Sequence, residues 1–220
     1  MLRKTPHQFP IVDLPRKASY LDISQNISTQ KTRPAIFLDR DGVIIANRAP
    51  YVLSWTDVEV LPGSLEALSR LALAHWAVVV VTNQACIGKG LLSIQEARKI
   101  NQRLLEHITA CGGRVDAIYM CPHIPGEQCI CRKPKPGLLL QAAKDLHLEL
   151  KSSILIGDAL SDLQAGWKAG LHRLILVRTG RGRDQLQQAA RAWKGPDFIV
   201  HENLLTAVRW LLLSQVSNDR

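Results

Sequence analysis

Short segments that are apolar throughout recur along the chain from residue 35 onward. They occupy residues 35–38, 77–82, 115–120, 153–157, 174–177 and 197–200. Runs of this length without polar alternation are typical of strands that are buried on both faces of a parallel sheet.

Helical patterns separate most of these segments. Apolar residues at helical spacing predict helices over residues 63–74, 93–110, 136–146, 160–169 and 202–213. Ser93 followed by Glu96 is a typical helix N-terminus, and Pro136 is typical of a helix start. The alternation of strands and helices predicts an α/β fold with a doubly wound, mainly parallel sheet.

Residues 1–33 lack this periodicity. They are polar, contain three prolines and carry six Lys/Arg against two Asp/Glu. We predict that residues 1–33 form a basic, flexible or loosely docked extension without a catalytic role, and that residues 34–220 form one globular domain.

Polar residues stand at the ends of several predicted strands, where a doubly wound sheet has its ligand crevice. They are Asp39, Asp41, Thr82, Asn83 and Asp158. One of the first two carboxylates could attack phosphorus while the other moves a proton, and together they could hold Mg²⁺; the alternative is a turn rich in Asp and Gly. The hydroxyl and amide could bind a phosphoryl oxygen or cap a helix.

Two later segments add charged candidates. Arg132 and Lys133 lie in a proline-stiffened loop and could neutralise a phosphoryl group, although a solvated basic loop would have the same composition. Asp158 could complete a Mg²⁺ site. Asp162, one helical turn later, could orient a metal-bound water or interact with the helix dipole.

A cysteine cluster occupies residues 121–131. Cys121, His123, Cys129 and Cys131 form a C-x-H and C-x-C pair, which suits a closed, structural, tetrahedral Zn²⁺ site. The alternative is a group of buried cysteines with an incidental histidine. The N-terminus lacks the apolar core of a signal peptide, so we expect a cytoplasmic protein, in which disulfides are rare.

Net charge changes this picture only slightly. The chain has 28 Lys+Arg and 19 Asp+Glu, a formal charge of +9, which indicates an anionic partner. The excess lies in residues 1–33 and 173–194, outside the motifs at the strand ends. A basic zinc-containing protein that binds or trims nucleic acid remains an alternative, but no aromatic stacking platform supports it. No apolar run is long enough to span a membrane.

Five segments resemble the haloacid dehalogenase superfamily of phosphatases, in the small capless branch that contains the heptose 1,7-bisphosphate 7-phosphatases. They are FLDRDGVI, VVVTNQACIGKG, CPHIPGEQCICRKPKPG, IGDALSDLQAG and LVRTG. The resemblance extends over roughly residues 34–215. It implies a phosphatase domain over residues 34–220 without a large cap domain, with a zinc loop at residues 121–131.

The resemblance also implies roles for individual residues. Asp39 would be the nucleophile, Asp41 the general acid and base, Thr82 a phosphoryl ligand and Lys133 the residue that stabilises its charge. Mg²⁺ would be held by Asp39, the backbone carbonyl of Asp41, and Asp158. Arg132 would contact the anionic part of the substrate. The sugar pocket would be lined by Asn47, Arg48, Ala49, Pro50, Asn83, Gln84 and Ala85.

The function implied is the Mg²⁺-dependent removal of phosphate from a small phosphorylated sugar by a monomer. Heptose 1,7-bisphosphate, from lipopolysaccharide heptose synthesis, is the first candidate, and histidinol phosphate or another sugar phosphate is the alternative. The chain departs from the family pattern at Ala85-Cys86, where relatives often have Ser-Gly, and at Ala159, where they often have lysine. The insert within the zinc loop is also shorter than in some relatives.

Overall fold

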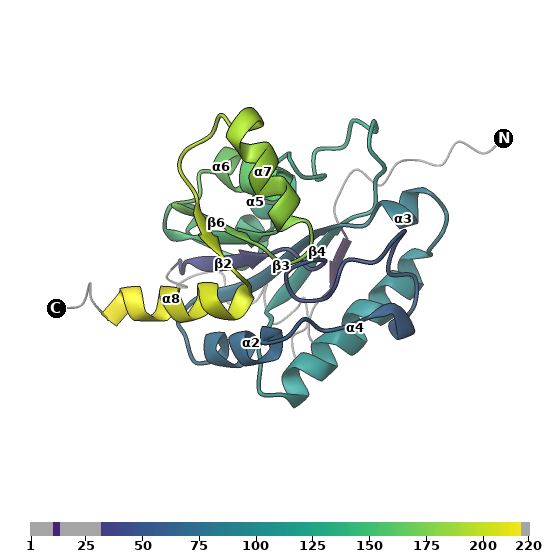
Figure 1. The fold of residues 1–220 in the computed structure, drawn as a ribbon. Helices are drawn as coiled ribbons and strands as arrows, with labels where there is room; N and C mark the ends of the chain where they lie inside the picture. Colours follow the sequence, from purple (N-terminus) through teal and green to yellow (C-terminus); the bar gives the residue numbers. More distant parts are fainter. Residues whose placement is uncertain (1–10, 14–31, 217–220) are drawn as a thin grey trace.

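The computed structural model describes residues 11–13 and 32–216, and it contains one seven-stranded sheet (Figure 1). The strands are β1 (Ile11–Asp13), β2 (Ala35–Leu38), β3 (Ala77–Asn83), β4 (Ala117–Cys121), β5 (Ile154–Gly157), β6 (Arg173–Val177) and β7 (Ile199–His201). Their order is β1-β4-β3-β2-β5-β6-β7, and every neighbouring pair is parallel except β1 with β4. The predicted doubly wound, mainly parallel sheet is therefore confirmed.

Helices cover both faces of the sheet (Figure 1). One face carries α2 (Ser64–Ala72), α4 (Ile94–Ala110) and α8 (Leu204–Val216). The other carries α5 (Gly137–Leu146), α6 (Leu160–Lys168) and α7 (Gly182–Ala192). Short helices complete the connections, namely η1 (Trp55–Asp57), α3 (Ala85–Gly88) and η2 (Leu150–Ser152).

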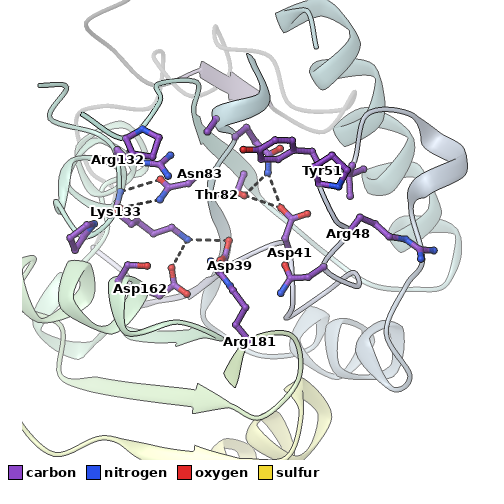
Figure 2. A pocket seen from close by; sticks show the side chains of 18 residues that line it. Asp39, Asp41, Arg48, Tyr51, Thr82, Asn83, Arg132, Lys133, Asp162 and Arg181 are labelled. Carbon is purple, nitrogen blue, oxygen red and sulfur yellow. Dashed lines mark hydrogen bonds and ion pairs between the residues drawn. The ribbon is translucent and has the colours of Figure 1, made fainter. Parts of the chain in front are cut away.

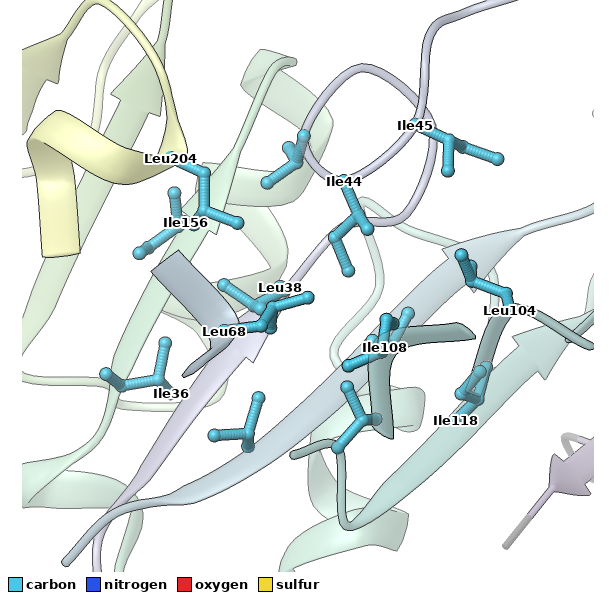
Figure 3. Packing of buried hydrophobic residues seen from close by; sticks show 14 of the residues in the cluster. Ile36, Leu38, Ile44, Ile45, Leu68, Leu104, Ile108, Ile118, Ile156 and Leu204 are labelled. Atoms are coloured by element: carbon cyan, nitrogen blue, oxygen red, sulfur yellow. The ribbon is translucent and has the colours of Figure 1, made fainter. Parts of the chain in front are cut away.

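The central strands are apolar throughout because helices bury them from both sides. Ile36 and Leu38 of β2 pack into the cluster beneath α2, α4 and α8 (Figure 3). Ala35 and Phe37, the alternate residues of the same strand, pack into the cluster beneath α5 and α6. This double burial explains why no polar alternation is visible in the sequence.

The helix starts follow local chemistry. Ser93 precedes α4, and its hydroxyl accepts a hydrogen bond from the backbone N–H of Glu96 at 3.1 Å, as the predicted N-cap requires. Pro136 occupies the residue before α5, which begins at Gly137. In the fully described stretches between β2 and β3 and between β3 and β4, the chain forms only η1 and α2, and α3 and α4, so neither connection carries a cap domain.

Apart from the short helices η1, α3 and η2, two described elements were not predicted. The strand β1 lies within the supposed extension and pairs Asp13 with Ile118 of β4, so residues 11–13 are docked on the sheet edge. The rest of that segment, apart from residues 32 and 33, lies outside the described residues. Helix α7 was also missed, because Leu186 and Ala189 are almost its only apolar contacts with the core and the rest of its surface is polar.

The carboxyl ends of β2, β3 and β5 meet in the middle of the sheet, because these three strands are parallel neighbours. The first residue beyond β2, Asp39, donates its backbone N–H to the carbonyl of Ile156 at 3.1 Å, which continues the pairing by one residue. The sheet thus holds this backbone at a defined position. Among the described helices, none is long and apolar enough to cross a membrane.

Leu68 and Leu73 allow a matched test of this packing. Leu68 of α2 is fully buried in the cluster shown in Figure 3, whereas Leu73, directly after the helix, is 93% exposed. We expect Leu68→Ala to lower the free energy of unfolding by about 2–5 kcal/mol, because it opens a cavity. Leu73→Ala should change it by less than about 0.5 kcal/mol. Urea denaturation followed by circular dichroism measures both, and equal losses would contradict the packing described.

Candidate active site

Lys133 forms the centre of a buried ionic cluster at the carboxyl edge of the sheet (Figure 2). Its ammonium lies 3.0 Å from Asp39 Oδ1 and 2.8 Å from Asp162 Oδ1, and it donates a hydrogen bond to the carbonyl of Val81 at 2.7 Å. Burial by itself would lower the pKa of Lys133, but Asp162 and Asp39 outweigh that effect and the pKa is raised. Lys133 is therefore a permanent cation at this site.

Asn83 fixes the loop that carries Lys133. Its side-chain Nδ2 donates to the Lys133 carbonyl, and its Oδ1 accepts from the Lys133 backbone N–H, both at 3.1 Å. A residue at the end of β3 therefore clamps a loop 50 positions later in the chain. Asn83 was predicted to line the sugar pocket, and it does border the cavity. Its side-chain oxygen and nitrogen, however, both form hydrogen bonds with the Lys133 backbone.

Asp39 lies among other carboxylates, and the positive charge of Lys133 does not compensate for all of them. Burial raises the pKa of Asp39 to about 8; Lys133 opposes the rise, while the carboxylates of Asp162, Asp158 and Asp41 add to it. Carboxylate oxygens of Asp39, Asp158 and Asp162 all lie within 4.8 Å of one another. A group of buried oxygen donors with surplus negative charge has the chemistry that Mg²⁺ requires.

Asp158 lies beneath the cavity and is completely buried. Its carboxylate accepts hydrogen bonds from Asn47 Nδ2 at 2.8 Å and from the Arg181 backbone N–H at 2.8 Å, and Arg181 Nη2 lies 2.8 Å from its Oδ1. Two glycines with positive φ, Gly42 and Gly180, approach so closely that an added Cβ would lie 2.2 and 2.3 Å from Asp158 Oδ2. The space around this carboxylate therefore excludes any larger residue at either position.

Asp41 faces the other side of the cavity. Gln84 Nε2 donates to its Oδ2 at 2.8 Å, and Arg40 Nε donates to the same oxygen at 3.1 Å. The hydroxyl of Thr82 lies 3.4 Å away and itself accepts a hydrogen bond from Gln84 at 3.0 Å. Three neighbours thus orient one carboxylate that still borders the cavity (Figure 2).

These groups surround a cavity of about 560 Å³, a size typical of small-molecule sites. Most predicted site residues border it, namely Asp39, Asp41, Asn47, Arg48, Pro50, Thr82, Asn83, Gln84, Ala85, Arg132, Lys133 and Asp162. Ala49, which was predicted with them, does not border it, and its short side chain is exposed to solvent. Asp158 does not border it either, because its side chain is completely buried behind its neighbours.

Sequence reasoning missed two arginines. Arg181 borders the cavity and contacts Asp158, although it belongs to a basic stretch that had been assigned no part in the site. Arg40, which stands between Asp39 and Asp41 in the sequence, is only 2% exposed and contacts Asp41. The signal was present in both cases: a cation follows a predicted strand within LVRTGRG, and another separates two carboxylates in DRDG.

The cysteine cluster closes the loop before Lys133. Cys121 Sγ lies 3.8 Å from Cys129 Sγ and 3.4 Å from His123 Nδ1, and Cys131 Sγ lies 3.3 Å from the same nitrogen. Sulfur atoms that share a tetrahedral zinc are about 3.8 Å apart when the Zn–S bond is 2.3 Å. The four donor atoms lie within 4.8 Å of one another, so the cluster could hold a zinc ion.

Comparisons with known proteins agree with this geometry. Residues 130–207 match a family model described as HAD-hydrolase-like. The chain is 42% identical over 153 residues to D-glycero-beta-D-manno-heptose-1,7-bisphosphate 7-phosphatase of Bordetella bronchiseptica, covering 70% of this chain and 85% of that protein. It is 38% identical over 151 residues to the Pseudomonas aeruginosa enzyme of the same name, covering 69% and 84%.

The fold agrees as well. A crystal structure of the D,D-heptose 1,7-bisphosphate phosphatase from B. bronchiseptica, complexed with magnesium and phosphate, superimposes with a TM-score of 0.77. The alignment has 38% sequence identity and covers 82% of this chain and 99% of that one. This chain belongs to the haloacid dehalogenase superfamily of phosphatases.

Membership in this superfamily makes the two departures from its pattern informative. Cys86 is fully buried, with its sulfur 3.6 Å from Gln84 Oε1, so it packs behind the cavity and does not form its rim. Ala159 is buried at the start of α6, where its backbone N–H donates to Asp162 Oδ2 at 3.0 Å. The phosphatase therefore has no side-chain cation at position 159, and Arg181 is the cation that contacts Asp158.

A substitution at Gly42 tests whether the close approach of this glycine fixes the position of the Asp158 carboxylate. Gly42→Ala should displace Asp158 and weaken Mg²⁺ binding by about tenfold or more, because residues that orient a ligand matter nearly as much as the ligand itself. Isothermal titration with Mg²⁺ measures the affinity. Gly170→Ala is the matched control: its φ is also positive, at +80°, but nothing lies within 4 Å of an added Cβ. If both variants bind Mg²⁺ like the parent protein, the position of Asp158 does not depend on the close approach of Gly42.

Proposed function

We propose that this phosphatase is Mg²⁺-dependent and removes the 7-phosphate of D-glycero-D-manno-heptose 1,7-bisphosphate through an aspartyl-phosphate on Asp39. The observation that carries the proposal is the buried Asp39–Lys133 pair at the base of the cavity, with Asp41 two residues away. The named relatives support the substrate. We further propose that the enzyme acts as a monomer in the cytoplasm.

In the first step, an Asp39 carboxylate oxygen attacks phosphorus, and the bond from phosphorus to the sugar oxygen breaks. Asp41 gives a proton to that oxygen, which therefore leaves as a hydroxyl and not as an alkoxide. Lys133 lies 3.0 Å from Asp39 and counters the charge of the phosphoryl oxygens as the group is transferred. Thr82 adds a hydrogen bond to one of these oxygens.

In the second step, Asp41 accepts a proton from a water molecule that attacks the phosphorus of the aspartyl-phosphate. The bond between phosphorus and Asp39 breaks, inorganic phosphate leaves, and both carboxylates return to their starting states. One water is consumed in each cycle. The bonds from Gln84 and Arg40 keep Asp41 facing the cavity through both steps.

The residues that would hold Mg²⁺ are Asp39, Asp158 and the backbone carbonyl of Asp41. Bound there, the ion supplies positive charge that allows a buried carboxylate and an anionic phosphoryl group to approach one another. The raised pKa of Asp39, caused by burial among other carboxylates, supports this assignment. Asp162 is already paired with Lys133 and the Ala159 N–H, so we assign it to orienting Lys133.

The distribution of cations supports a substrate with a second anionic group. Lys133 lies at the base of the cavity, whereas Arg48 and Arg132 border it on opposite sides (Figure 2). A substrate with one phosphate at Asp39 could place another against either arginine. We assign this contact to Arg132, because the charge of Arg48 is already paired with the Glu59 carboxylate at 3.0 Å, whereas Arg132 bonds to a neutral carbonyl, that of His123.

The zinc loop is proposed to aim Arg132 and Lys133. Arg132 Nη1 donates to the carbonyl of the zinc-ligand candidate His123 at 3.0 Å, and Cys131 directly precedes Arg132. Lys135 Nζ also donates to the carbonyl of Cys129 at 2.6 Å. A zinc ion held by the four side chains would therefore fix the backbone from which both cations project.

A panel of phosphate esters tests the substrate. With heptose 1,7-bisphosphate we expect release of one phosphate and retention of the 1-phosphate, which phosphorus NMR of the product distinguishes. Asp39→Asn should lower kcat by about a thousandfold or more, because an amide cannot form the aspartyl-phosphate. Asp184→Asn, on the exposed face of α7, is the matched control and should retain the parent rate.

The same panel can refute the proposal at two levels. Faster hydrolysis of histidinol phosphate or of a DNA 3′-phosphate would overturn the substrate while leaving the phosphatase chemistry intact. Undiminished turnover by Asp39→Asn would overturn the assignment of the nucleophile.

The zinc proposal has its own test. Cys129→Ser should lose zinc, measured by mass spectrometry of the metal content, and lower the melting temperature by about 5 °C or more. It should also lower kcat, because Arg132 and Lys133 lose their anchor. Cys111→Ser, an exposed cysteine outside the cluster, should change none of the three measurements. A zinc-free Cys129→Ser protein with the parent's turnover would show that the loop does not aim the cations.

A further inference from the structure

A chain of buried polar side chains leads from Asp41 to the edge of the sheet. Arg40 contacts Asp41, Asn101 of α4 contacts Arg40, and Asp13 of β1 contacts Asn101. Asp13 lies 88 positions before Asn101 in the sequence. The segment before residue 34 thus has a physical connection to the carboxylate assigned as the general acid.

Arg40 forms the first link. Its guanidinium is almost completely buried, and it grips Asp41 with two nitrogens, Nε to Oδ2 at 3.1 Å and Nη2 to Oδ1 at 3.3 Å. Such a two-point contact sets the plane of the carboxylate as well as its position. The remaining terminal nitrogen, Nη1, donates to Asn101 Oδ1 at 2.8 Å.

Asn101 transmits this constraint because its two ends are chemically different. It is fully buried, its oxygen faces Arg40, and its Nδ2 donates to Asp13 Oδ2 at 2.9 Å. A guanidinium can only donate hydrogen bonds, and an ionised carboxylate can only accept them. The two partners therefore dictate the same orientation of the amide. Without Asp13, Asn101 Nδ2 would keep only a weak acceptor, Met120 Sδ at 3.9 Å.

Asp13 ends the chain near the surface. Its other carboxylate oxygen lies 3.3 Å from Arg98 Nε, which is half-exposed. Burial raises the pKa of Asp13, while the hydrogen bond from Asn101 and the two nearby guanidinium groups oppose that rise. The four charged groups alternate in sign from the cavity outward, so each buried charge has a compensating neighbour.

We propose that Asp13 and Asn101 are positioning residues for the general acid, acting on Asp41 through Arg40. The proposal rests on the function proposed above, in which Asp41 protonates the leaving oxygen. Without Asp13, the Asn101 amide loses the acceptor that sets its orientation, and Arg40 Nη1 loses its fixed partner. The two-point grip on Asp41 then loosens, and the proton is delivered less efficiently.

The need of the leaving group for a proton provides the test. An alkyl phosphate must be protonated as its bond breaks, whereas p-nitrophenyl phosphate releases a stable nitrophenolate without that help. The value of kcat/KM includes only steps up to the formation of the aspartyl-phosphate. We therefore expect Asp13→Ala to lower kcat/KM for the sugar phosphate about tenfold, a fraction of what general acid catalysis supplies, and to change that for p-nitrophenyl phosphate less than about twofold.

Matched variants separate positioning from folding. Asp13→Asn keeps an oxygen that accepts from Asn101 and should retain the parent ratio of the two kcat/KM values. Arg98→Gln removes only the outer contact of Asp13 and should also retain it. Asn101→Ala should reproduce the selective loss, and it replaces Asp13→Ala if that variant does not fold. Both substrates are measured on one preparation, so a smaller folded fraction leaves the ratio unchanged.

An equal fall for both substrates in Asp13→Ala and Asn101→Ala, or no fall for either, would overturn the positioning role. A selective fall of kcat/KM for the sugar phosphate in Asp13→Asn would also overturn the positioning role, because the hydrogen bond to Asn101 would still be present. A parent enzyme that hydrolyses neither phosphate ester would instead refute the proposed function, so the two failures are distinguishable.

Discussion

The site depends on a buried ammonium, since Lys133 can remain charged inside the protein only while Asp39 and Asp162 lie within 3.0 Å of it. Removing one partner of a buried ion pair typically costs about 3–5 kcal/mol, because the other charge is left uncompensated. Much of the surrounding structure meets this constraint. Asn83 clamps the backbone of Lys133, and the cysteine cluster closes the loop that leads to it. The parallel strands bring Asp39 and the start of α6 to the same edge of the sheet.

Strand ends were predictable because a parallel sheet converts a sequence pattern into a spatial one. Each apolar run identified a strand, although the edge strand β7 is only half-buried. The polar residues at the ends of β2, β3 and β5 had to meet at one edge whatever the details of the loops. Helix α7 and strand β1 could not be found in this way. The first is amphipathic, but few of its residues are apolar and its composition is mostly polar, so it resembles a loop in sequence. The second has only three residues, which are too few to show a period.

Contacts between side chains were even less accessible than these elements. Arg40 meets Asn101 across 61 positions of sequence, and the contact exists only because α4 packs on the face of the sheet toward which Arg40 turns. An Asn in the middle of an amphipathic helix reads as an ordinary polar residue until its burial is known. Asn47 is similar: the family resemblance predicted a pocket residue, but its bond to Asp158 depends on how closely two glycines allow the loops to approach. Packing distances decide such roles, and a residue pattern does not contain them.

Charge was informative only after it had been placed in space. The basic excess between residues 173 and 194 lies outside the four motifs at the strand ends, so the sequence assigned none of its cations to the site. Most of it does lie elsewhere: Arg183 and Arg191 are exposed on α7. Arg181 is the exception, since its backbone N–H and guanidinium both bind Asp158, while its guanidinium lies 3.9 Å from Asp39. This cation lies among the carboxylates assigned to Mg²⁺ and balances part of their charge. A count over a segment averages one functional cation with several solvated ones, so net charge by itself could neither support nor exclude a role for this stretch.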